Sequence, residues 1–566
     1  MATKPRIAHL AGPMATIQNT PPLITSNKAR AKFGLSPLHN PDGSPARFDT
    51  LRSQRLAAPA KVYVEQFSAH PLESDSAHLY GPPDGYIDAA GKFHKERTGP
   101  GDKPVYEIEL APEDGLYPLP YMARQASGAA WEEECAVAFA PDEQARQGFF
   151  PDGSRSFEEI DRTQIGVDGT VNQIGGKADI DFYRAMPPGG FRNGVPATSR
   201  KDTGEGDIPR ETRGRDFFPY KPYHLSASPP RPSLARATNA VQQILASGKY
   251  DGAVWTEGSP TNEETIYWLN LLIDTTLPIC GNSAQRPQGQ ISADGPKNIV
   301  DSVTYIASRV WADAEGRNRA GAVMIQEQRI FAARNVQKAD ARPGGYVATG
   351  GHGGIIGAAG HDGAPLLHFV PTTRHTYLSD VNLTRLPGEQ TGVRRVGGRV
   401  ETVRVPLKGR DGMLLDTAIP GVAIIKDASY WANDFANSIE AQGDLIAAID
   451  HALAAEPLAG FVIEGLTPYG AMVSAPRTAL MLRAVMSGLP VVRVGRGNTE
   501  GFVPSHDPNW IGGSNLTATK ARLLLMAALM KLGSLPPAAD PDHPTGSEMR
   551  AIHAKIKEYQ KIFDTH

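Results

Sequence analysis

The sequence predicts an α/β protein with two doubly wound parallel-sheet domains and a large irregular insertion in the first of them. Two blocks of the 566-residue chain alternate short apolar runs with longer amphipathic segments, a pattern typical of parallel sheets covered by helices. Residues 77–228 are instead rich in Gly, Pro and charged residues and show little helical period. A structureless loop of that length is improbable inside a compact domain, so we expect an inserted subdomain or an extended arm.

The predicted strands and helices follow from local patterns. Before the insertion, Arg6–Ala11 is an apolar run that ends at a Gly-Pro turn signal, and residues 61–67 form a second strand candidate. After it, the first block has strands at 252–256, 278–282 and 321–326 and helices at 233–247, 262–274 and 293–313. The second block has strands at 421–426, 460–465 and 489–495 and helices at 444–456, 475–488 and 519–533, with a charged, surface-docked helix at 545–563.

These elements give a domain plan. We expect residues 1–76 and 229–362 to form an N-terminal domain and residues 77–228 to form the insertion. Residues 363–415 hold the linker region, and residues 416–566 form a C-terminal domain. A prior of roughly 100–200 residues per domain agrees with three or four such units.

Composition excludes several classes of function. A net charge of -3 argues against a nucleic-acid partner, because such surfaces cluster Lys and Arg. The two cysteines, Cys135 and Cys280, have no CxxC spacing and suit a reducing compartment. Met1–Leu10 has no signal-peptide pattern, and no apolar run approaches 18 residues, so we expect a cytoplasmic protein with no membrane partner.

The loops that follow the predicted strands hold the candidate site, because ligands collect at the carboxyl ends of parallel strands. These loops contain GPMATIQNT with Thr16 and Thr20, TEGSPTNEET, and RNVQKAD with Lys338. A hydroxyl needs a nearby base to become a nucleophile, and a buried lysine can lose its proton and serve as one. Spacing alone does not single out one of these hydroxyls, and any single Ser or Thr is more simply explained as a turn or cap residue. For Glu263 and Glu264 we favour the structural explanation, in which they complement the helix dipole and complete a capping box with Thr261.

The order of the motifs resembles the L-asparaginase and glutaminase-asparaginase family. The central string YDGAVWTEGSPTNEETIYWLNLLI, then RP and SADGPKN, is similar to the family's DG-V-x-T-H-G-T-D-T-x-E-E-T, G-x-x-R-P and S-x-D-G-x-x-N. LAGPMATI resembles the family's A-T-G-G-T-I, NVQKAD resembles D-V-x-K-x-N, and VYVEQFSAHPLESDS resembles the strand and loop that supply a substrate-binding serine. In the second block, GFVIEGLTPYGAM and GGSNLTATKARLLLMAAL are also similar to family segments.

This resemblance implies a fold of the asparaginase type and a mechanism. Thr16 falls on the nucleophilic threonine, Ser259 on the second catalytic hydroxyl and Lys338 on its base partner. The acyl-enzyme then releases ammonia or an amine, and water releases the acid. Substrate binding falls to Ser74, Asp75, Glu257 and Gly258. The family also implies a small-molecule amide substrate and a homodimer or homotetramer. We expect no cofactor and no metal site, because His352 and His361 have no partner at ligand spacing.

Four positions depart from the family pattern. Pro260 stands where the family has the Asp that completes its catalytic set and contacts the substrate's amino group. Glu257 replaces the family's histidine, and it either restores a carboxylate near the site or faces solvent. Tyr469-Gly470-Ala471 replaces the family's N-G-N turn. No tyrosine follows Thr16 closely; Phe33 is the nearest aromatic residue.

The departures favour hydrolysis of an amide other than free asparagine, since the groups that grip the α-amino end are altered while the reacting groups remain. Aromatic and basic residues of the insertion suit a larger or anionic substrate, although packing explains any one of them: Tyr183, Phe191, Arg192, Arg213, Arg215, Phe217, Phe218, Tyr220 and Tyr223. One alternative is a true asparaginase or glutaminase in which Glu257 replaces the missing Asp. Another is an inactive binding protein that keeps the fold, for which Pro260 is the best support.

Overall fold

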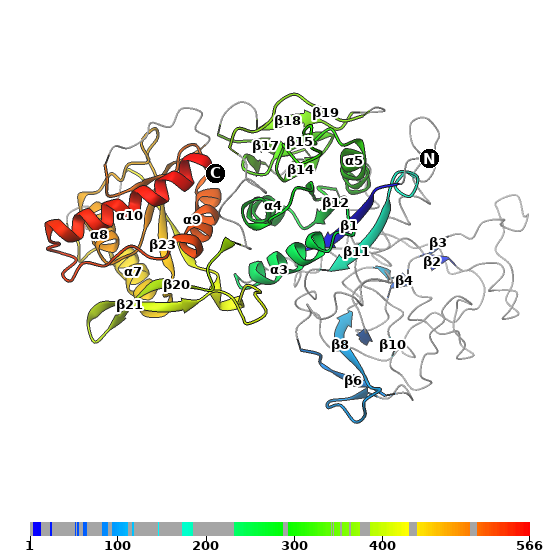
Figure 1. Ribbon diagram of the computed structural model, residues 1–566, viewed down its shortest axis with the longest axis horizontal. Helices are drawn as coiled ribbons and strands as arrows, with labels where there is room; N and C mark the ends of the chain where they lie inside the picture. The colour runs from blue at the N-terminus through cyan, green and yellow to red at the C-terminus, as the bar shows by residue number, and fades with distance from the viewer. Residues whose placement is uncertain are drawn as a thin grey trace, which may run out of the picture. The chain divides into compact units, whose positions relative to one another are not determined.

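The structure is a computed structural model, drawn as a ribbon in Figure 1, and its internal contacts divide the chain into two compact units. The first comprises Met1–Pro229, Thr256–Gly258 and Ala284–Val300; the second comprises Pro230–Trp255, Ser259–Ser283 and Asp301–His566. The structure describes residues 4–12, 23–24, 51–52, 54–55, 60–64, 82–88, 93–110, 116–117, 145–146, 173–184, 231–286, 292–340, 342, 344–350, 354–360, 364–373, 385–429, 438–497 and 507–566.

A parallel strand pair begins the first unit. β1 (Arg6–Ala11) confirms the predicted first strand, and it pairs with β11 (Asp179–Arg184) in a register that runs from Arg6 opposite Asp179 to Ala11 opposite Arg184. Ile7, Ala8 and Leu10 are fully buried. β11 lies inside the segment that the sequence marks as an insertion, so this part of it pairs directly with the first strand of the chain. The run DIDFYR hid that role because its acidic residues weaken the apolar pattern.

A second sheet of the first unit has the order β10-β5-β8-β6-β7. β5 pairs antiparallel with β8 and parallel with β10, and β6 pairs antiparallel with both β8 and β7. The strands are β5 (Ala60–Val64), β6 (Gly85–Ile87), β7 (Phe93–His94), β8 (Lys103–Leu110) and β10 (Ala145–Arg146). β5 confirms the strand predicted at 61–67, although it ends at Val64. Two short antiparallel pairs complete the unit: β2 (Leu23–Ile24) with β3 (Leu51–Arg52), and β4 (Gln54–Arg55) with β9 (Leu116–Tyr117).

The first predicted α/β block begins in the second unit. Its helices are α3 (Ser233–Ala246), α4 (Thr261–Leu272) and α5 (Gly295–Ser308). Its strands are β12 (Gly252–Thr256), β13 (Ile279–Asn282), β14 (Val323–Gln326), β15 (Arg329–Ala332), β18 (Ile355–Ala358) and β19 (Leu366–Leu367). β13 and β14 pair in parallel, as predicted, but β14, β15, β18 and β19 pair antiparallel. Glu327 and Gln328 explain the reversal, because both have positive φ and form a two-residue hairpin turn that the apolar pattern does not reveal.

Two hairpins follow this sheet. β16 (Val336–Lys338) pairs antiparallel with β17 (Tyr346–Ala348). β20 (Glu389–Val396) pairs antiparallel with β21 (Arg399–Pro406), and the turn between them is formed by Gly397 and Gly398, both with positive φ. This second hairpin occupies much of the segment in which the sequence places a linker, and a short 3₁₀ helix, η8 (Asp416–Ala418), follows it.

The second predicted α/β block forms a four-stranded sheet whose strands are all parallel, as predicted. Its strands are β22 (Gly421–Lys426), β23 (Ala459–Gly465), β24 (Val491–Gly495) and β25 (Ile511–Gly512). Its helices are α7 (Gly443–Ala455), α8 (Ala475–Met486), α9 (Ala518–Leu532) and α10 (Gly546–Thr565). α9 packs on β22, β23 and β24, α10 packs on β25 and α9, and α7 and α8 contact each other and the sheet (Figure 1).

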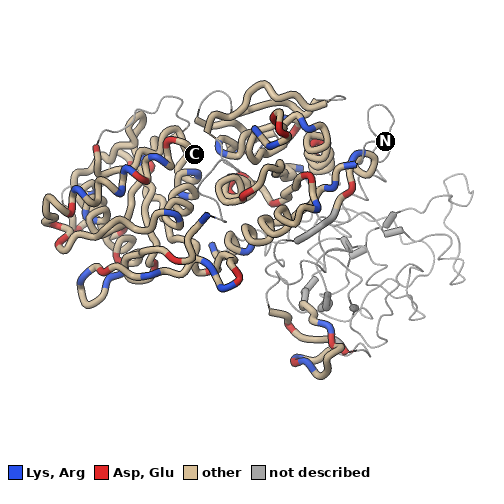
Figure 2. The backbone as a smooth tube through the Cα atoms, viewed as in Figure 1, with Lys and Arg blue, Asp and Glu red and all other residues tan. Residues whose placement is uncertain are grey.

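Helix α10 confirms the predicted surface-docked C-terminal helix. Thr545 and Glu548 form a reciprocal capping box at its start. Its buried residues lie on one face: Ile552, Ile556, Tyr559, Ile562 and Phe563. Figure 2 shows charges of both signs interspersed along the described backbone, in agreement with the small net charge.

Candidate active site

Ser259 and Lys338, two of the predicted catalytic residues, both contact Tyr346. Ser259 lies in the turn between β12 and α4, while Lys338 ends β16 and pairs across the hairpin with Tyr346, the first residue of β17. The Tyr346 hydroxyl donates a hydrogen bond to Ser259 Oγ at 2.7 Å. Lys338 Nζ lies 5.3 Å from the centre of the Tyr346 ring, within the range of a cation–π contact. The fold therefore gathers a hydroxyl, a phenol and an ammonium group.

Sequence reasoning missed Tyr346. Its signal was present, because the Pro-Gly-Gly that follows Lys338 indicates a reversal that would place a residue of the returning strand opposite the lysine. Asp340 shapes this turn by accepting from Arg342 N at 2.8 Å and from the Arg342 guanidinium at 2.7 Å. A Cβ on Gly345 would lie 2.5 Å from the Asp340 main-chain oxygen, so only glycine fits there.

Glu263 anchors the main chain of the candidate base. Its carboxylate accepts a hydrogen bond from Lys338 N, and Glu263 is buried, with 8% of its surface exposed. Burial raises the pKa of the Glu263 carboxyl from 4.5 to about 7, although the nearby Lys520 ammonium opposes that rise. Glu263 thus holds the strand that presents Lys338, a role that its place in the first turn of α4 did not reveal.

Lys520, on α9, is the buried cation beside Glu263. It is 1% exposed and donates to the main-chain oxygens of Glu263 and, at 2.8 Å, of Ala333. Burial lowers the pKa of Lys520 from 10.5 to about 8, against the pull of the carboxyls of Glu263 and Glu264. Ala333 lies just before β16, and Glu263 lies in the first turn of α4. Lys520 therefore binds both the segment that leads to Lys338 and the helix that follows Ser259.

The predicted capping box at the start of α4 is wrong. Pro260 occupies the N-cap position and makes no side-chain cap bond. Glu263 and Glu264 do lie in the first turn, as expected, but Glu263 bonds to Lys338 N and Glu264 pairs with Arg522 at 2.5 Å. The sequence could not show this, because both partners come from distant segments.

Helix α4 holds Ser259 in place through close packing on both sides. Most of its residues are buried, including Ile266, Tyr267 and Trp268. Asn262 Nδ2 donates to the main-chain oxygen of Asn282 at 2.5 Å, and a Cβ on Gly281 would lie 2.9 Å from Asn262 Oδ1. α4 is therefore fixed against β13, and the turn that carries Ser259 is fixed with it.

Glu257 and Gly258, two predicted substrate-binding residues, belong to the first unit. Glu257 is 2% exposed, which excludes the alternative that it faces solvent. The neighbouring Thr256 is bonded through its hydroxyl to His9 Nε2 at 2.6 Å, and its main-chain oxygen accepts from Gly12 N at 2.9 Å. These two hydrogen bonds hold Thr256, the residue before Glu257, against the segment that contains His9 and Gly12.

The SADGPKN motif is structural in the first unit. The Asp294 carboxylate accepts from the main-chain N–H groups of Gln285 at 2.9 Å and Arg286 at 2.8 Å. Asn298 Nδ2 adds a bond to the same carboxylate at 3.2 Å. Asp294 therefore fixes the turn that follows β13 against the start of α5.

Several predicted site residues lie outside the described residues: Thr16, Ser74 and Asp75. So does most of the aromatic and basic set of the insertion, of which only the Tyr183 backbone is described, within β11. Their roles stay predictions.

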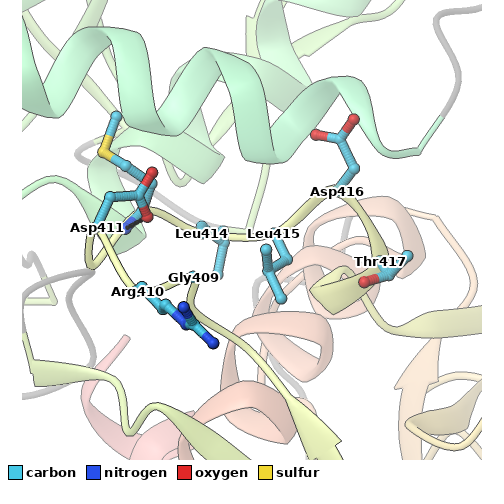
Figure 3. Close-up of a pocket in the computed structure, with 8 residues that line it drawn as sticks. Gly409, Arg410, Asp411, Leu414, Leu415, Asp416 and Thr417 are labelled. Atoms are coloured by element: carbon cyan, nitrogen blue, oxygen red, sulfur yellow. Dashed lines mark hydrogen bonds between the residues drawn. The ribbon is translucent and has the colours of Figure 1, made fainter.

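A pocket of about 590 Å³ lies elsewhere in the second unit, around the turn between β21 and η8 (Figure 3). It is lined by Gly409, Arg410, Asp411, Met413, Leu414, Leu415, Asp416 and Thr417. Gly412, with positive φ, makes the turn, and Asn239 of α3 holds Leu414 through two hydrogen bonds of 2.8 and 2.9 Å. None of the predicted site residues lines this pocket. We attribute the pocket to the shape of the turn and not to the candidate active site.

Within the described part of the chain, no three His, Cys, Asp or Glu side chains gather in a way that could hold a metal ion. A separate search of that part finds no helix with the length and apolar character needed to cross a membrane.

Comparison with known proteins finds similarity to asparaginases in the segment that holds the candidate site. A family model described as "Asparaginase, N-terminal" matches residues 226–352, a range that contains Ser259, Lys338 and Tyr346. A glutaminase-asparaginase of Acinetobacter glutaminasificans is 27% identical over 306 residues, which are 53% of this chain and 75% of that protein. L-asparaginase 2 of Bacillus subtilis is 35% identical over 105 residues, 19% of this chain and 26% of that protein. The chain therefore spans three quarters of the first relative but only about a quarter of the second.

Among solved structures, a probable cytoplasmic L-asparaginase from Campylobacter jejuni matches 70% of this chain and 88% of its own, with 22% identity and a TM-score of 0.45.

Proposed function

We propose that the chain is an amide hydrolase of the asparaginase family that works through an acyl-enzyme. Thr16 attacks the amide carbonyl, and ammonia or an amine leaves. Ser259 and Lys338 form the second hydroxyl and its base partner, and main-chain N–H groups stabilise the oxyanion. Water then releases the acid and frees Thr16. Ser74, Asp75, Glu257 and Gly258 bind the substrate.

The observation that carries this proposal is the convergence of Ser259 and Lys338 on Tyr346. They come from a turn and from a hairpin that are far apart in the sequence, and they share one partner residue. Retention of Thr16, Ser259 and Lys338 together in one chain argues against a protein that only binds a ligand. The main-chain anchors at Glu263 and Lys520 support the same reading, because they fix the strand that carries Lys338.

The substrate we propose is an amide other than free asparagine. In the family, the Asp at the position of Pro260 contacts the substrate's amino group, and proline has no group that can replace it. Tyr469-Gly470-Ala471 lacks the amide side chain of the family's turn. A site that has lost the partners of an α-amino group no longer favours substrates that carry one.

Glu257 supports a second candidate, a true asparaginase or glutaminase. Its buried carboxyl group, next to Gly258 and Ser259 in the sequence, would replace the carboxyl group of the missing Asp. Both candidates take a small-molecule amide, and for both we propose a homodimer or homotetramer in the cytoplasm.

Covalent labelling tests the nucleophile. We expect a diazo-ketone analogue of glutamine, or a slowly hydrolysed amide, to leave an adduct on Thr16 that intact-protein mass spectrometry detects and peptide mapping locates. Thr16→Ala should lose the adduct, and Thr20→Ala, which removes a hydroxyl only four positions later in the sequence, should keep it. Absence of any adduct, together with no ammonia release from any amide, would shift the assignment to a binding protein.

Matched pairs of amides test the substrate. L-asparagine and succinamate differ only by the α-amino group, and so do L-glutamine and glutaramate. We expect the amides without the amine to have kcat/KM at least equal to that of their partners. A strong preference for L-asparagine or L-glutamine, abolished by Glu257→Gln, would instead establish the second candidate.

A further inference from the structure

Tyr346 contacts both Ser259 and Lys338. Its hydroxyl lies 2.7 Å from Ser259 Oγ, and its ring lies 5.3 Å from Lys338 Nζ. The residue is 1% exposed, so its position is set by packing and not by solvent. Cross-strand pairing with Lys338 in the β16–β17 hairpin fixes the same relationship through the main chain.

Ordinary packing does not require this hydrogen bond. A buried phenol needs an acceptor, and a main-chain oxygen is the common choice. Tyr267 and Tyr559, two other buried tyrosines of the same unit, donate to the main-chain oxygens of His566 and Gly533. Tyr346 instead donates to the side chain of Ser259, a candidate site residue. The next residue, Pro260, has no polar side chain that could bond to Ser259.

We propose that Tyr346 is a positioning residue of the amide hydrolysis, which links the Ser259 hydroxyl to the Lys338 side chain. Donation from Tyr346 occupies a lone pair of Ser259 Oγ, so the Ser259 proton is directed to another acceptor. The face of the ring contacts Lys338 Nζ and restricts its position. This inference rests on the proposed function.

The two contacts of Tyr346 can be separated by substitution. Tyr346→Phe keeps the ring beside Lys338 and removes only the donor to Ser259. Tyr346→Leu removes both. We expect Tyr346→Phe to lower kcat about tenfold or more while KM stays within about twofold, because a lost orientation of the reacting group affects the chemical step. Tyr346→Leu should lower kcat further.

The assay measures ammonia release from L-asparagine, L-glutamine, succinamate and glutaramate, and uses the best of the four as substrate. Tyr559→Phe is the matched control, since it also removes a buried phenol hydroxyl from the same unit but leaves Ser259 untouched. Thermal unfolding of each variant accompanies the kinetics. An equal loss of kcat in Tyr559→Phe would show a merely structural effect and overturn the assignment.

A double-mutant cycle gives the sharper test. If Tyr346 acts through Ser259, the Ser259→Ala/Tyr346→Phe variant should be no slower than Ser259→Ala alone. Additive losses, or an unchanged kcat in Tyr346→Phe, would overturn the inference. The proposed function has its own test, independent of Tyr346: it is wrong if Thr16→Ala and Lys338→Ala keep wild-type activity. If no amide is turned over, the labelling rate with the diazo-ketone reagent replaces kcat, and absence of labelling removes both the function and the inference.

Discussion

Lys520 on α9 donates its buried ammonium to the main-chain oxygen of Glu263 on α4, although 257 residues separate the two in the sequence. The Glu263 carboxylate in turn accepts from Lys338 N, so one chain of contacts runs from the C-terminal helix pair to the candidate base. Breaking it should affect both stability and catalysis, and the two effects can be measured independently.

Lys520→Met should lower the free energy of unfolding by about 3–5 kcal/mol, because it leaves the oxygens of Glu263 and Ala333 without their donor and the Glu263 carboxyl without its counter-charge. Urea unfolding followed by circular dichroism measures the change. The control is Lys555→Met on α10, where Lys555 pairs with Glu558 near the surface and the loss should stay below about 1 kcal/mol. Equal losses in the two variants would contradict the buried-pair argument.

Stability should depend on pH through Glu263. Its pKa of about 7 in the folded state lies above its usual value of 4.5, so between pH 4.5 and 7 the folded state holds a proton that the unfolded state has lost. The resulting stabilisation is complete below about pH 4.5 and is lost as the pH rises through 7. We therefore expect the free energy of unfolding of the wild type, relative to Glu263→Gln, to fall between pH 5 and 7 by at most about 1.4 kcal/mol per pH unit. A difference that stays constant or rises over this range would refute the assigned protonation of Glu263.

Activity should depend on the acceptor at Glu263 more than on its charge. Glu263→Gln retains an oxygen for Lys338 N, whereas Glu263→Ala leaves that N–H without an acceptor and frees the end of β16. We expect Glu263→Ala to lower kcat about tenfold and Glu263→Gln to lower it much less, in steady-state ammonia release at a pH where both variants are folded. A larger loss in Glu263→Gln would mean that the carboxylate charge itself takes part in the reaction.

Gly345→Ala should damage the hairpin that carries Lys338 and Tyr346. The added Cβ would lie 2.5 Å from the Asp340 main-chain oxygen, which cannot move without opening the turn. We expect a loss of about 1–3 kcal/mol in stability, measured by urea unfolding, together with a fall in kcat. Gly443→Ala serves as the control, because its added Cβ meets no atom within 4 Å at the start of α7, and it should leave stability unchanged or slightly higher.

The sequence determined the elements whose patterns are local. The runs RIAHLA, GAVWT and GVAIIK form β1, β12 and β22 at the predicted bounds, since an apolar run between turn signals needs no distant information to read as a strand. The motifs that resemble the asparaginases also marked Ser259 and Lys338 as site residues. Local patterns did not reveal the pairing of β11 with β1 or the antiparallel edge at β15, because strand partners are chosen by packing between distant segments.

Only the tertiary structure decided how the candidate site is assembled. Tyr346 meets Ser259 across 87 residues of sequence, and Lys520 meets Glu263 across 257. The sequence assigned Glu263 to the helix dipole and said nothing of Tyr346 or Lys520, because nothing local distinguishes a buried phenol or lysine at a site from one in a core. Hydrogen bonds and buried charges depend on which groups the fold brings within about 3 Å, and spacing along the chain does not fix that distance.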